Sequence, residues 1–289
     1  MEKDKRFIVY LKTLVLALFV LSSVLFVQAK GVNAAGPTMP YSFFLEHPYS
    51  ITGVRANGMA VDLDDSGWLF MNEFRADVNI YQNLFGIYAK FPFAGVTNFG
   101  PTDEDDYDFG NIGLGGKVAI LNTDSAVLTG GFELITPTTS GDLGAAAALA
   151  YFLQFPYFLE DAWTFKPYAV FGYGRGIFGF QANISGDIIT NADDFEGDDT
   201  EFILEYGATA SVTPNLPLPF STSFLLELFM ASSTSFDSNI TGAYLTPGVR
   251  FGGQILSLGA GVQIPFGSDE ITDFANVGFL LDLVVRFGS

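Results

Sequence analysis

Residues 276–287, NVGFLLDLVVRF, alternate between two kinds of side chain. Every second residue counted back from Phe287 is apolar, whereas the other parity carries Asp282 and Arg286. Successive side chains of a β-strand point to opposite faces, so this pattern predicts a strand with one apolar face and one mixed face. Such a strand fits a soluble sandwich with its apolar face inward, or a membrane β-barrel with its apolar face toward lipid.

The beginning of the chain has the parts of a secretory signal peptide. A basic start is followed by an apolar run at residues 14–27, and small residues allow cleavage after Ala29 or Ala34. The run is short for a membrane-spanning helix. We therefore expect residues 1–34 to be removed on export. Residues 35–48 hold three prolines and no periodicity, which predicts an irregular periplasmic lead or plug before a barrel at 49–289.

The composition excludes several classes of protein. The net charge is −19 at pH 7, and an acidic surface repels phosphate backbones, so no nucleic-acid partner is expected. The chain has no cysteine, which removes thiolate catalysis and disulfides. After residue 34 no apolar run reaches the length of a spanning helix, although 16% of the chain is aromatic. An exported, apolar and aromatic sequence of this kind is typical of an outer-membrane β-barrel.

Twelve segments have the alternation or the composition of strands: 51–61, 68–81, 84–93, 110–121, 126–136, 143–154, 163–180, 202–212, 224–230, 243–251, 256–264 and 276–287. Most run to about ten residues or more, which suits a tilted crossing of a bilayer. The alanine-rich segment 143–154 also suits a helix, but an even number of strands requires it. We predict an all-β fold: a closed antiparallel up-and-down transmembrane β-barrel of about 12 strands, closed by pairing of 51–61 with 276–287.

Short turns alternate with longer polar loops along the chain, as expected when one barrel end faces the periplasm and the other faces outside. The segments 94–109 and 181–200 are predicted to be two of the long outer loops. Both are acidic, so they are candidates for holding divalent cations against lipopolysaccharide, or for keeping the surface soluble.

Almost every predicted strand carries a charged or polar residue on its non-apolar face, which in a barrel faces the lumen. These predicted lumen residues are Glu73, Arg75, Asp77, Lys90, Lys117, Glu133, Glu205, Glu227, Arg250, Asp282 and Arg286. Both signs of charge occur, so one reading is a set of ion pairs that only holds the lumen together. The other reading is a polar conduit or a ligand site.

Two motifs could carry chemistry. His47 is the only histidine, and it lies in the irregular lead without a serine or an acid at a telling spacing, so we expect a solvated side chain and no catalysis. Residues 62–73, DLDDSGWLFMNE, match the spacing of a calcium-binding loop. Both flanks have the pattern of strands rather than helices. A looser, weak calcium site at Asp62, Asp64 and Asp65 is the remaining alternative, and no other cofactor is expected.

Three short stretches carry a resemblance to a known family: IGLGGKVAI (112–120), FELITPTTSGDLG (132–144) and GAGVQIPFG (259–267). In these the chain resembles the transporter-like outer-membrane barrels of the MetA pathway of phenol degradation. The resemblance implies uptake of small, often hydrophobic compounds. It defines no functional residues.

These observations predict a channel or transporter for small molecules, including hydrophobic or aromatic ones, in the cell outer membrane. The expected partners are outer-membrane lipid, lipopolysaccharide, the solute and the barrel assembly machinery. The alternative is a non-conducting structural or interaction barrel whose acidic outer loops bind cations, lipopolysaccharide or another protein. An enzyme is not expected.

Overall fold

A computed structural model describes residues 39–63, 67–99, 104–139, 152–190, 200–233, 241–253, 255–267 and 276–287. The predicted signal peptide and the acidic stretch 193–199 lie outside these described residues. In the described part of the chain, no helix is long and apolar enough to cross a membrane.

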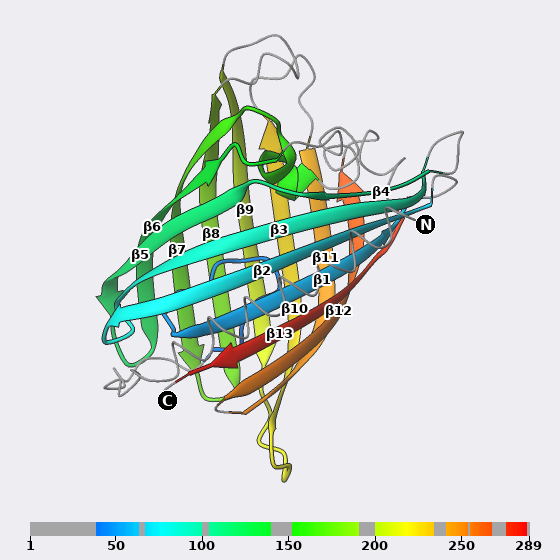
Figure 1. Ribbon diagram of the computed structural model, residues 1–289. Coiled ribbons are helices and arrows are strands. Elements are labelled where there is room, and N and C mark those ends of the chain that lie inside the picture. The colour runs from blue at the N-terminus through cyan, green and yellow to red at the C-terminus, as the bar shows by residue number, and fades with distance from the viewer. Residues whose placement is uncertain are drawn as a thin grey trace.

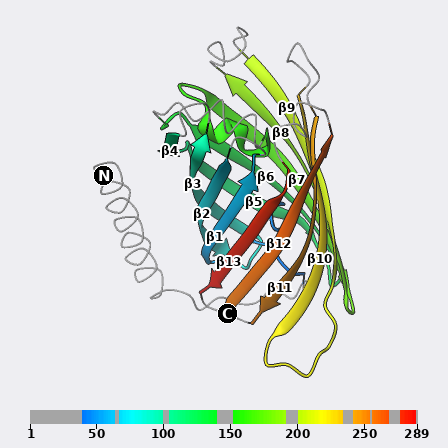
Figure 2. The same cartoon turned by 90° about the vertical axis from the view of Figure 1, so that its right-hand side faces the viewer.

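One antiparallel sheet of thirteen strands closes on itself (Figures 1 and 2). The strands are β1 (Gly53–Asp62), β2 (Trp68–Tyr81), β3 (Phe85–Phe99), β4 (Glu104–Phe109), β5 (Ile112–Asn122), β6 (Ala126–Thr136), β7 (Trp163–Arg175), β8 (Phe178–Thr190), β9 (Thr200–Val212), β10 (Ser221–Ser233), β11 (Thr241–Gly252), β12 (Leu256–Gly267) and β13 (Gly278–Arg286). β4 and β5 both pair with β3 and occupy one position in the ring. β1 pairs with β13, as predicted. The fold is therefore the predicted closed barrel of twelve antiparallel strands.

A short 3-10 helix, η2 (Phe152–Phe158), lies between β6 and β7 in the chain and contacts the wall at Asn111, between β4 and β5. The Asn111 backbone N–H donates to the carbonyl of Tyr157 at 2.6 Å, and the Asn111 side chain donates to the carbonyl of Leu159 at 2.6 Å. These bonds turn Asn111 away from the sheet and toward η2. The helix lies at the upper end of the barrel as drawn in Figure 1.

Four sequence predictions about these elements were wrong. Phe152 to Gln154, the described end of the strand predicted at 143–154, belong to η2. The single strand predicted at 163–180 is the hairpin β7–β8, which turns at Gly176 with a φ of 61°. The loop predicted at 94–109 holds the end of β3 and all of β4, and the loop predicted at 181–200 holds most of β8. In the two predicted loops, an acidic composition concealed strand residues whose backbone groups are paired in the sheet.

The outer face of the barrel is apolar. In β13, Phe279 and Leu281 are 51% and 63% exposed. The alternate residues Leu280, Asp282 and Val284 are buried. The same alternation exposes Ile120 and Phe224 on other strands. A band of exposed large apolar side chains around a closed barrel fits contact with lipid, because soluble proteins rarely expose so much apolar surface. The apolar face of residues 276–287 therefore points outward.

The inner face divides into two regions along the barrel. Near the upper rim, Phe155 and Phe158 of η2 pack among buried apolar side chains of the strands, including Leu69, Ile135 and Ile203. Below this core the inward side chains are charged or polar. The lower rim is the end with the short turns. The β9–β10 connection extends below the rest of this rim, and β13 ends there (Figure 1).

Candidate functional site

The lumen is crossed by the chain that precedes β1. We call residues 39–52 the inner segment. Ser42, Phe43, Leu45 and Ser50 of this segment are buried inside the barrel although they belong to no strand. Because a chain without secondary structure leaves its backbone polar groups unpaired, the strand side chains must satisfy them.

Glu227, in the middle of β10, binds three consecutive backbone N–H groups of the inner segment. Its Oε2 accepts from Phe43 at 2.7 Å, and its Oε1 accepts from Phe44 at 2.8 Å and Leu45 at 3.0 Å. A carboxylate with three N–H donors is a charge-assisted arrangement, stronger than ordinary backbone pairing. Glu227 therefore anchors the centre of the inner segment to the wall.

Arg55 of β1 holds the carbonyl side of the same stretch. Its Nη2 donates to the carbonyls of Ser42 at 2.8 Å and Phe43 at 2.5 Å, while its Nε pairs with Asp282 at 2.5 Å. The other oxygen of Asp282 is 2.5 Å from Nη2 of Arg250. One buried carboxylate thus serves two guanidinium groups from β1 and β11.

Glu46 is the only carboxylate of the described inner segment, and it bridges two wall cations. Both of its oxygens contact Arg75 of β2, and Oε1 lies 2.7 Å from Nζ of Lys117 on β5. Burial alone would raise the pKa of Glu46, but the positive charges of Arg75 and Lys117 outweigh it and hold that pKa well below its ordinary value. Arg75 also pairs with Asp77 at 2.8 Å. Glu46 is therefore an ion in this structure.

The Phe43 ring enters a socket made of glycines. A Cβ placed on Gly248 would lie 2.4 Å from the ring, and one placed on Gly259 would lie 2.8 Å from it. The absence of side chains at these inward positions of β11 and β12 makes room for the ring. Phe43 is 1% exposed, so the socket encloses it.

The prediction that His47 is solvated was wrong. The imidazole is buried, stacks on the Tyr41 ring at 4.1 Å, and hydrogen-bonds the backbone of Tyr49. Burial and the nearby charge of Lys117 lower the pKa of His47 to about 3, so the ring is neutral at ordinary pH. The sequence left open whether residues 35–48 are a lead or a plug, and the burial of His47 follows only if they enter the barrel.

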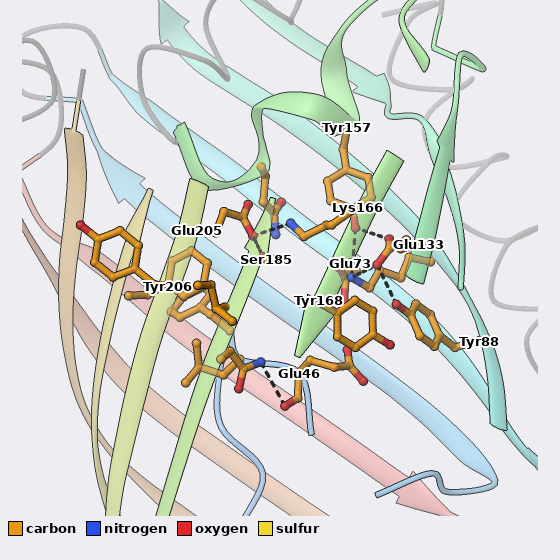
Figure 3. Close-up of a pocket in the computed structure, with 17 residues that line it drawn as sticks. Glu46, Glu73, Tyr88, Glu133, Tyr157, Lys166, Tyr168, Ser185, Glu205 and Tyr206 are labelled. Atoms are coloured by element: carbon orange, nitrogen blue, oxygen red, sulfur yellow. Dashed lines mark hydrogen bonds and ion pairs between the residues drawn. The ribbon is translucent and has the colours of Figure 1, made fainter. Parts of the chain in front are cut away.

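A cavity of about 90 Å³ lies between the inner segment and η2 (Figure 3). On one side of it, Glu133 of β6 pairs with Lys90 at 2.9 Å and accepts hydrogen bonds from the hydroxyls of Tyr88, at 2.9 Å, and of Tyr157. On the other side, Lys166 of β7 pairs with Glu205 at 2.5 Å.

Lys166 also lies 3.2 Å from Asp187, so it serves two acids. Glu73 of β2 lines the cavity as well, and within the described chain its carboxylate makes no hydrogen bond or ion pair. Phe44, Leu45 and Phe229 supply apolar contact. At that volume the cavity has room for about three water molecules, since water takes about 30 Å³ each. It is acidic overall and rich in tyrosine.

A second, larger space of about 800 Å³ opens at the lower rim. We call it the lower vestibule. It is lined by Tyr41 of the inner segment, by Arg250 and Arg286, and by the β9–β10 connection with Leu216 and Phe220. The inner segment separates this vestibule from the upper cavity.

The eleven residues predicted to line the lumen all lie on inward positions of the wall, but they do different things. Arg75, Lys117 and Glu227 hold the inner segment; Glu73, Lys90, Glu133 and Glu205 line the upper cavity; Asp77 and Asp282 pair with arginines; and Arg250 and Arg286 line the lower vestibule. Sequence reasoning missed Arg55, Lys166 and Asp187. Arg55 lies in a strand weakened by two glycines, and Asp187 lies in a segment predicted to be a loop.

The calcium prediction is not tested. Asp64 and Asp65 lie outside the described residues, and Asp62 ends β1 with its backbone paired to Asn276 and Val277. Glu73, the twelfth position of the predicted loop, is inside the barrel on β2. Among the described residues, no group of three potential ligands could hold a metal ion.

The barrel is similar to solved outer-membrane channels. It matches the COG4313 outer membrane channel from Pseudomonas putida F1 with a TM-score of 0.59 at 14% identity, over 86% of this chain and 100% of that one. It matches the NanC porin with a TM-score of 0.53 at 8% identity, over 81% of this chain and 100% of the porin. The KdgM porin gives a TM-score of 0.50 at 9% identity, over 82% and 99%.

At these identities the likeness concerns the fold. No protein-family model and no curated protein sequence matches the chain. The resemblance to the MetA phenol-degradation family therefore stays a prediction.

Proposed function

We propose that this chain is an outer-membrane channel for small molecules, closed in the present state by its inner segment. The observation that carries the proposal is the way the inner segment is held: by ion pairs and hydrogen bonds to Arg55, Arg75, Lys117 and Glu227. Such contacts exchange with water at a modest net cost, about 0.5–1.5 kcal/mol for an ordinary bond and more for a charged one. When the inner segment leaves the lumen, water can hydrate the charged side chains of the wall in its place.

The likeness to the COG4313 channel and the porins supports the same proposal through the fold. The lower rim then faces the periplasm, and the predicted export signal brings the chain to the outer membrane through the barrel assembly machinery. Outer-membrane lipid covers the apolar band, and lipopolysaccharide is the expected neighbour of the outer loops. The solute is a small molecule, including hydrophobic or aromatic ones, because the upper cavity offers tyrosine faces beside Phe44 and Phe229.

A non-conducting barrel is the second candidate, and one observation favours it. Two layers close the lumen, the apolar core around η2 and the inner segment below it. In that case the acidic outer loops would bind cations, lipopolysaccharide or a protein. No catalytic role is proposed, because the only histidine is buried and bonded to the backbone of Tyr49.

A reversible crosslink tests the two candidates. The Ser42 hydroxyl donates to the hydroxyl of Thr209 on β9 at 2.9 Å, and the chain has no cysteine of its own. The variant S42C/T209C can therefore form a disulfide that fixes the inner segment to the wall. We expect the native protein and the reduced variant to pass ions in planar bilayers and small aromatic solutes in liposomes, and the oxidised variant to pass neither.

The single variants S42C and T209C are the matched controls, and both should be insensitive to oxidant. Equal flux in the oxidised and reduced double variant would show that the inner segment is not the gate. An absence of current and of solute flux in the native protein, at any voltage, would exclude the channel and favour the non-conducting barrel.

A further inference from the structure

The lower vestibule differs in charge from the rest of the molecule. The whole chain carries −19, yet the only charged side chains among the described residues that line this vestibule are Arg250 and Arg286. The upper cavity, by contrast, is lined by four carboxylates and two lysines. The vestibule is therefore a positively charged space in an acidic protein.

The positive charge is only partly balanced. Asp282 is shared between Arg55 and Arg250, so one carboxylate faces two guanidinium groups. The carboxylate of Glu227 also attracts Arg250 electrostatically. It already accepts hydrogen bonds from three backbone N–H groups of the inner segment. Arg286 makes no ion pair in the described chain, and its Nη2 donates to the carbonyl of Gly253 at 2.5 Å.

Several donors in this space have no partner among the residues that the structure describes. Arg250 is 3% exposed, and its Nε has no hydrogen-bond acceptor among the described residues. The same holds for Nε of Arg286 and for the buried hydroxyl of Tyr41. A buried donor without an acceptor costs about 1–3 kcal/mol, and more when it is charged, so an acceptor from a ligand would be stabilising here.

These donors lie near one ring. The Tyr41 centroid is 5.9 Å from Cζ of Arg250 and 5.8 Å from Cζ of Arg286. Guanidinium groups match the two oxygens of a carboxylate. The remaining wall of the vestibule is partly apolar, with Leu216, Leu218 and Phe220. A volume of about 800 Å³ falls within the range of ordinary small-molecule sites.

We propose that the lower vestibule is a binding site for small organic anions, in which Arg250 and Arg286 hold a carboxylate and the β9–β10 connection covers an apolar body. The binding does not require conduction. The conclusion that the bound anion is also the transported solute, or leaves through this mouth, rests on the proposed function.

Benzoate is the probe, because it combines a carboxylate with an aromatic body. Equilibrium dialysis of radiolabelled benzoate against the purified full chain in detergent should show saturable binding to one site per chain. Benzamide has the same shape without the charge, so it should compete at least about tenfold more weakly. Equal competition by benzamide, or an absence of saturable binding, would overturn the proposal.

Variants locate the site. R286Q should weaken benzoate binding by at least about tenfold, because Arg286 lies at the rim and has no carboxylate partner to strand. R250Q should do the same, but it removes a partner of Asp282, so its folding is checked by heat-dependent migration on gels; if it fails to fold, R286Q decides. R175Q is the matched control, since Arg175 is exposed at the end of β7 and does not line the vestibule. Equal loss in R175Q, or no loss in R286Q, would refute the site.

The outcome is independent of the channel test. A protein that binds benzoate and passes no current keeps this site and loses the proposed function. A protein that conducts and binds no benzoate does the reverse.

Discussion

The carboxylate of Glu227 accepts a hydrogen bond from the backbone N–H of Phe43, at 2.7 Å, across 184 residues of sequence. Two further N–H groups, of Phe44 and Leu45, bind the same side chain. This contact ties the irregular start of the chain to the middle of the barrel wall. The closed state of the lumen therefore depends on a single buried acid more than on any other residue of β10.

Replacing Glu227 by alanine should release the inner segment. We call the state in which the inner segment occupies the lumen the seated state. The change leaves three buried N–H groups without an acceptor and weakens the seated state by about 3 kcal/mol or more. In a Ser42→Cys background, we expect a maleimide to label the cysteine roughly 100-fold faster in Glu227→Ala than with Glu227 present.

Glu205→Gln is the matched control, because Glu205 is another buried lumen acid that pairs with Lys166 and not with the inner segment. Its labelling should stay near that of the parent. Similar acceleration by both variants would mean that general loosening of the barrel, and not the loss of the Phe43–Leu45 contact, exposes the cysteine.

Acid should release the inner segment gradually, beginning below about pH 6.5. The groups around His47 are Tyr41, Glu46, Tyr49, Arg55, Arg75, Asp77 and Lys117. The pKa of His47 is about 3 when seated and about 6.5 when solvated, so below pH 6.5 the released state binds the extra proton. Each pH unit down to about 3 then shifts the balance toward release by about 1.4 kcal/mol, or tenfold.

Glu46 acts in the same direction at lower pH. Its pKa is lowered when seated, so its stabilising contribution is complete above its solvated value, near 4.3, and is lost as the pH falls through the lower seated value. His47→Gln should remove the dependence between pH 6.5 and about 4.5 and leave, below that range, only the part of the loss that comes from Glu46. Labelling of the cysteine at position 42 from pH 7.5 to about 3.5, divided at each pH by the labelling of a free thiol in the same buffer, checks this, and an unchanged profile in His47→Gln would contradict the assignment.

The wall of the barrel was predictable because alternation is a local property. The pattern of residues 276–287 gave the correct faces, with Leu281 outward and Asp282 inward. Parity alone also placed Lys90, Glu133 and Glu227 inside. The tight turn predicted at Gln82 and Asn83 is present, and both residues have positive φ.

The number of strands was right for reasons that were partly wrong. The hairpin β7–β8 was read as one strand, because Gly176 and Ile177 form a two-residue turn between flanks that continue the apolar pattern. The segment 143–154 was counted as a strand to keep the number even, and its described end is part of η2. The two errors cancelled. The alternation of loop lengths therefore gave no independent support to the alanine-rich strand.

Parity placed wall residues of the candidate site inside the barrel, and a plug was one alternative for residues 35–48, but the contacts that make up the site could not be predicted from the sequence. The site exists because the inner segment returns into the lumen, and its contacts join residues far apart, such as Ser42 with Thr209 and Thr129 with Pro48. No periodicity or motif marks such a segment, since its backbone is paired by side chains rather than by a ladder. The role of the glycines around the Phe43 ring could not be predicted either, because it depends on which side chain packs against them in the folded barrel.

Phe43 and Gly259 should show strong energetic coupling. Phe43→Ala removes a fully buried ring, at a cost of about 3–5 kcal/mol to the seated state. Gly259→Ala places a Cβ 2.8 Å from the ring and costs about 1–3 kcal/mol by overpacking. In the Phe43→Ala background the same alanine should cost almost nothing, because the ring is gone.

Labelling of the cysteine at position 42 measures all four corners of this cycle. Gly116→Ala is the control, since the nearest atom to its Cβ would lie 3.6 Å away. If the cost of Gly259→Ala is the same with and without the Phe43 ring, the clash is with Arg250, which also lies near this position, and the glycine socket is not what seats the ring.

The attachment of η2 to the barrel wall near the upper rim should depend on the Tyr157 hydroxyl. Tyr157 of η2 donates to Glu133 and accepts from Nζ of Lys90 at 3.0 Å, which fastens the helix to β6 and β3. Tyr157→Phe removes both bonds and should weaken the seating of η2 by about 1–2 kcal/mol, so the amides of Phe152–Phe158 should exchange with deuterium roughly tenfold faster. Tyr88→Phe removes a second hydroxyl from the same carboxylate, but Tyr88 belongs to β3, so exchange in η2 should stay nearly as it is in the native protein. Faster exchange in both variants would mean that η2 responds to the charge balance at Glu133, and unchanged exchange in Tyr157→Phe would mean that the apolar contacts of Phe155 and Phe158 hold the helix without the hydroxyl.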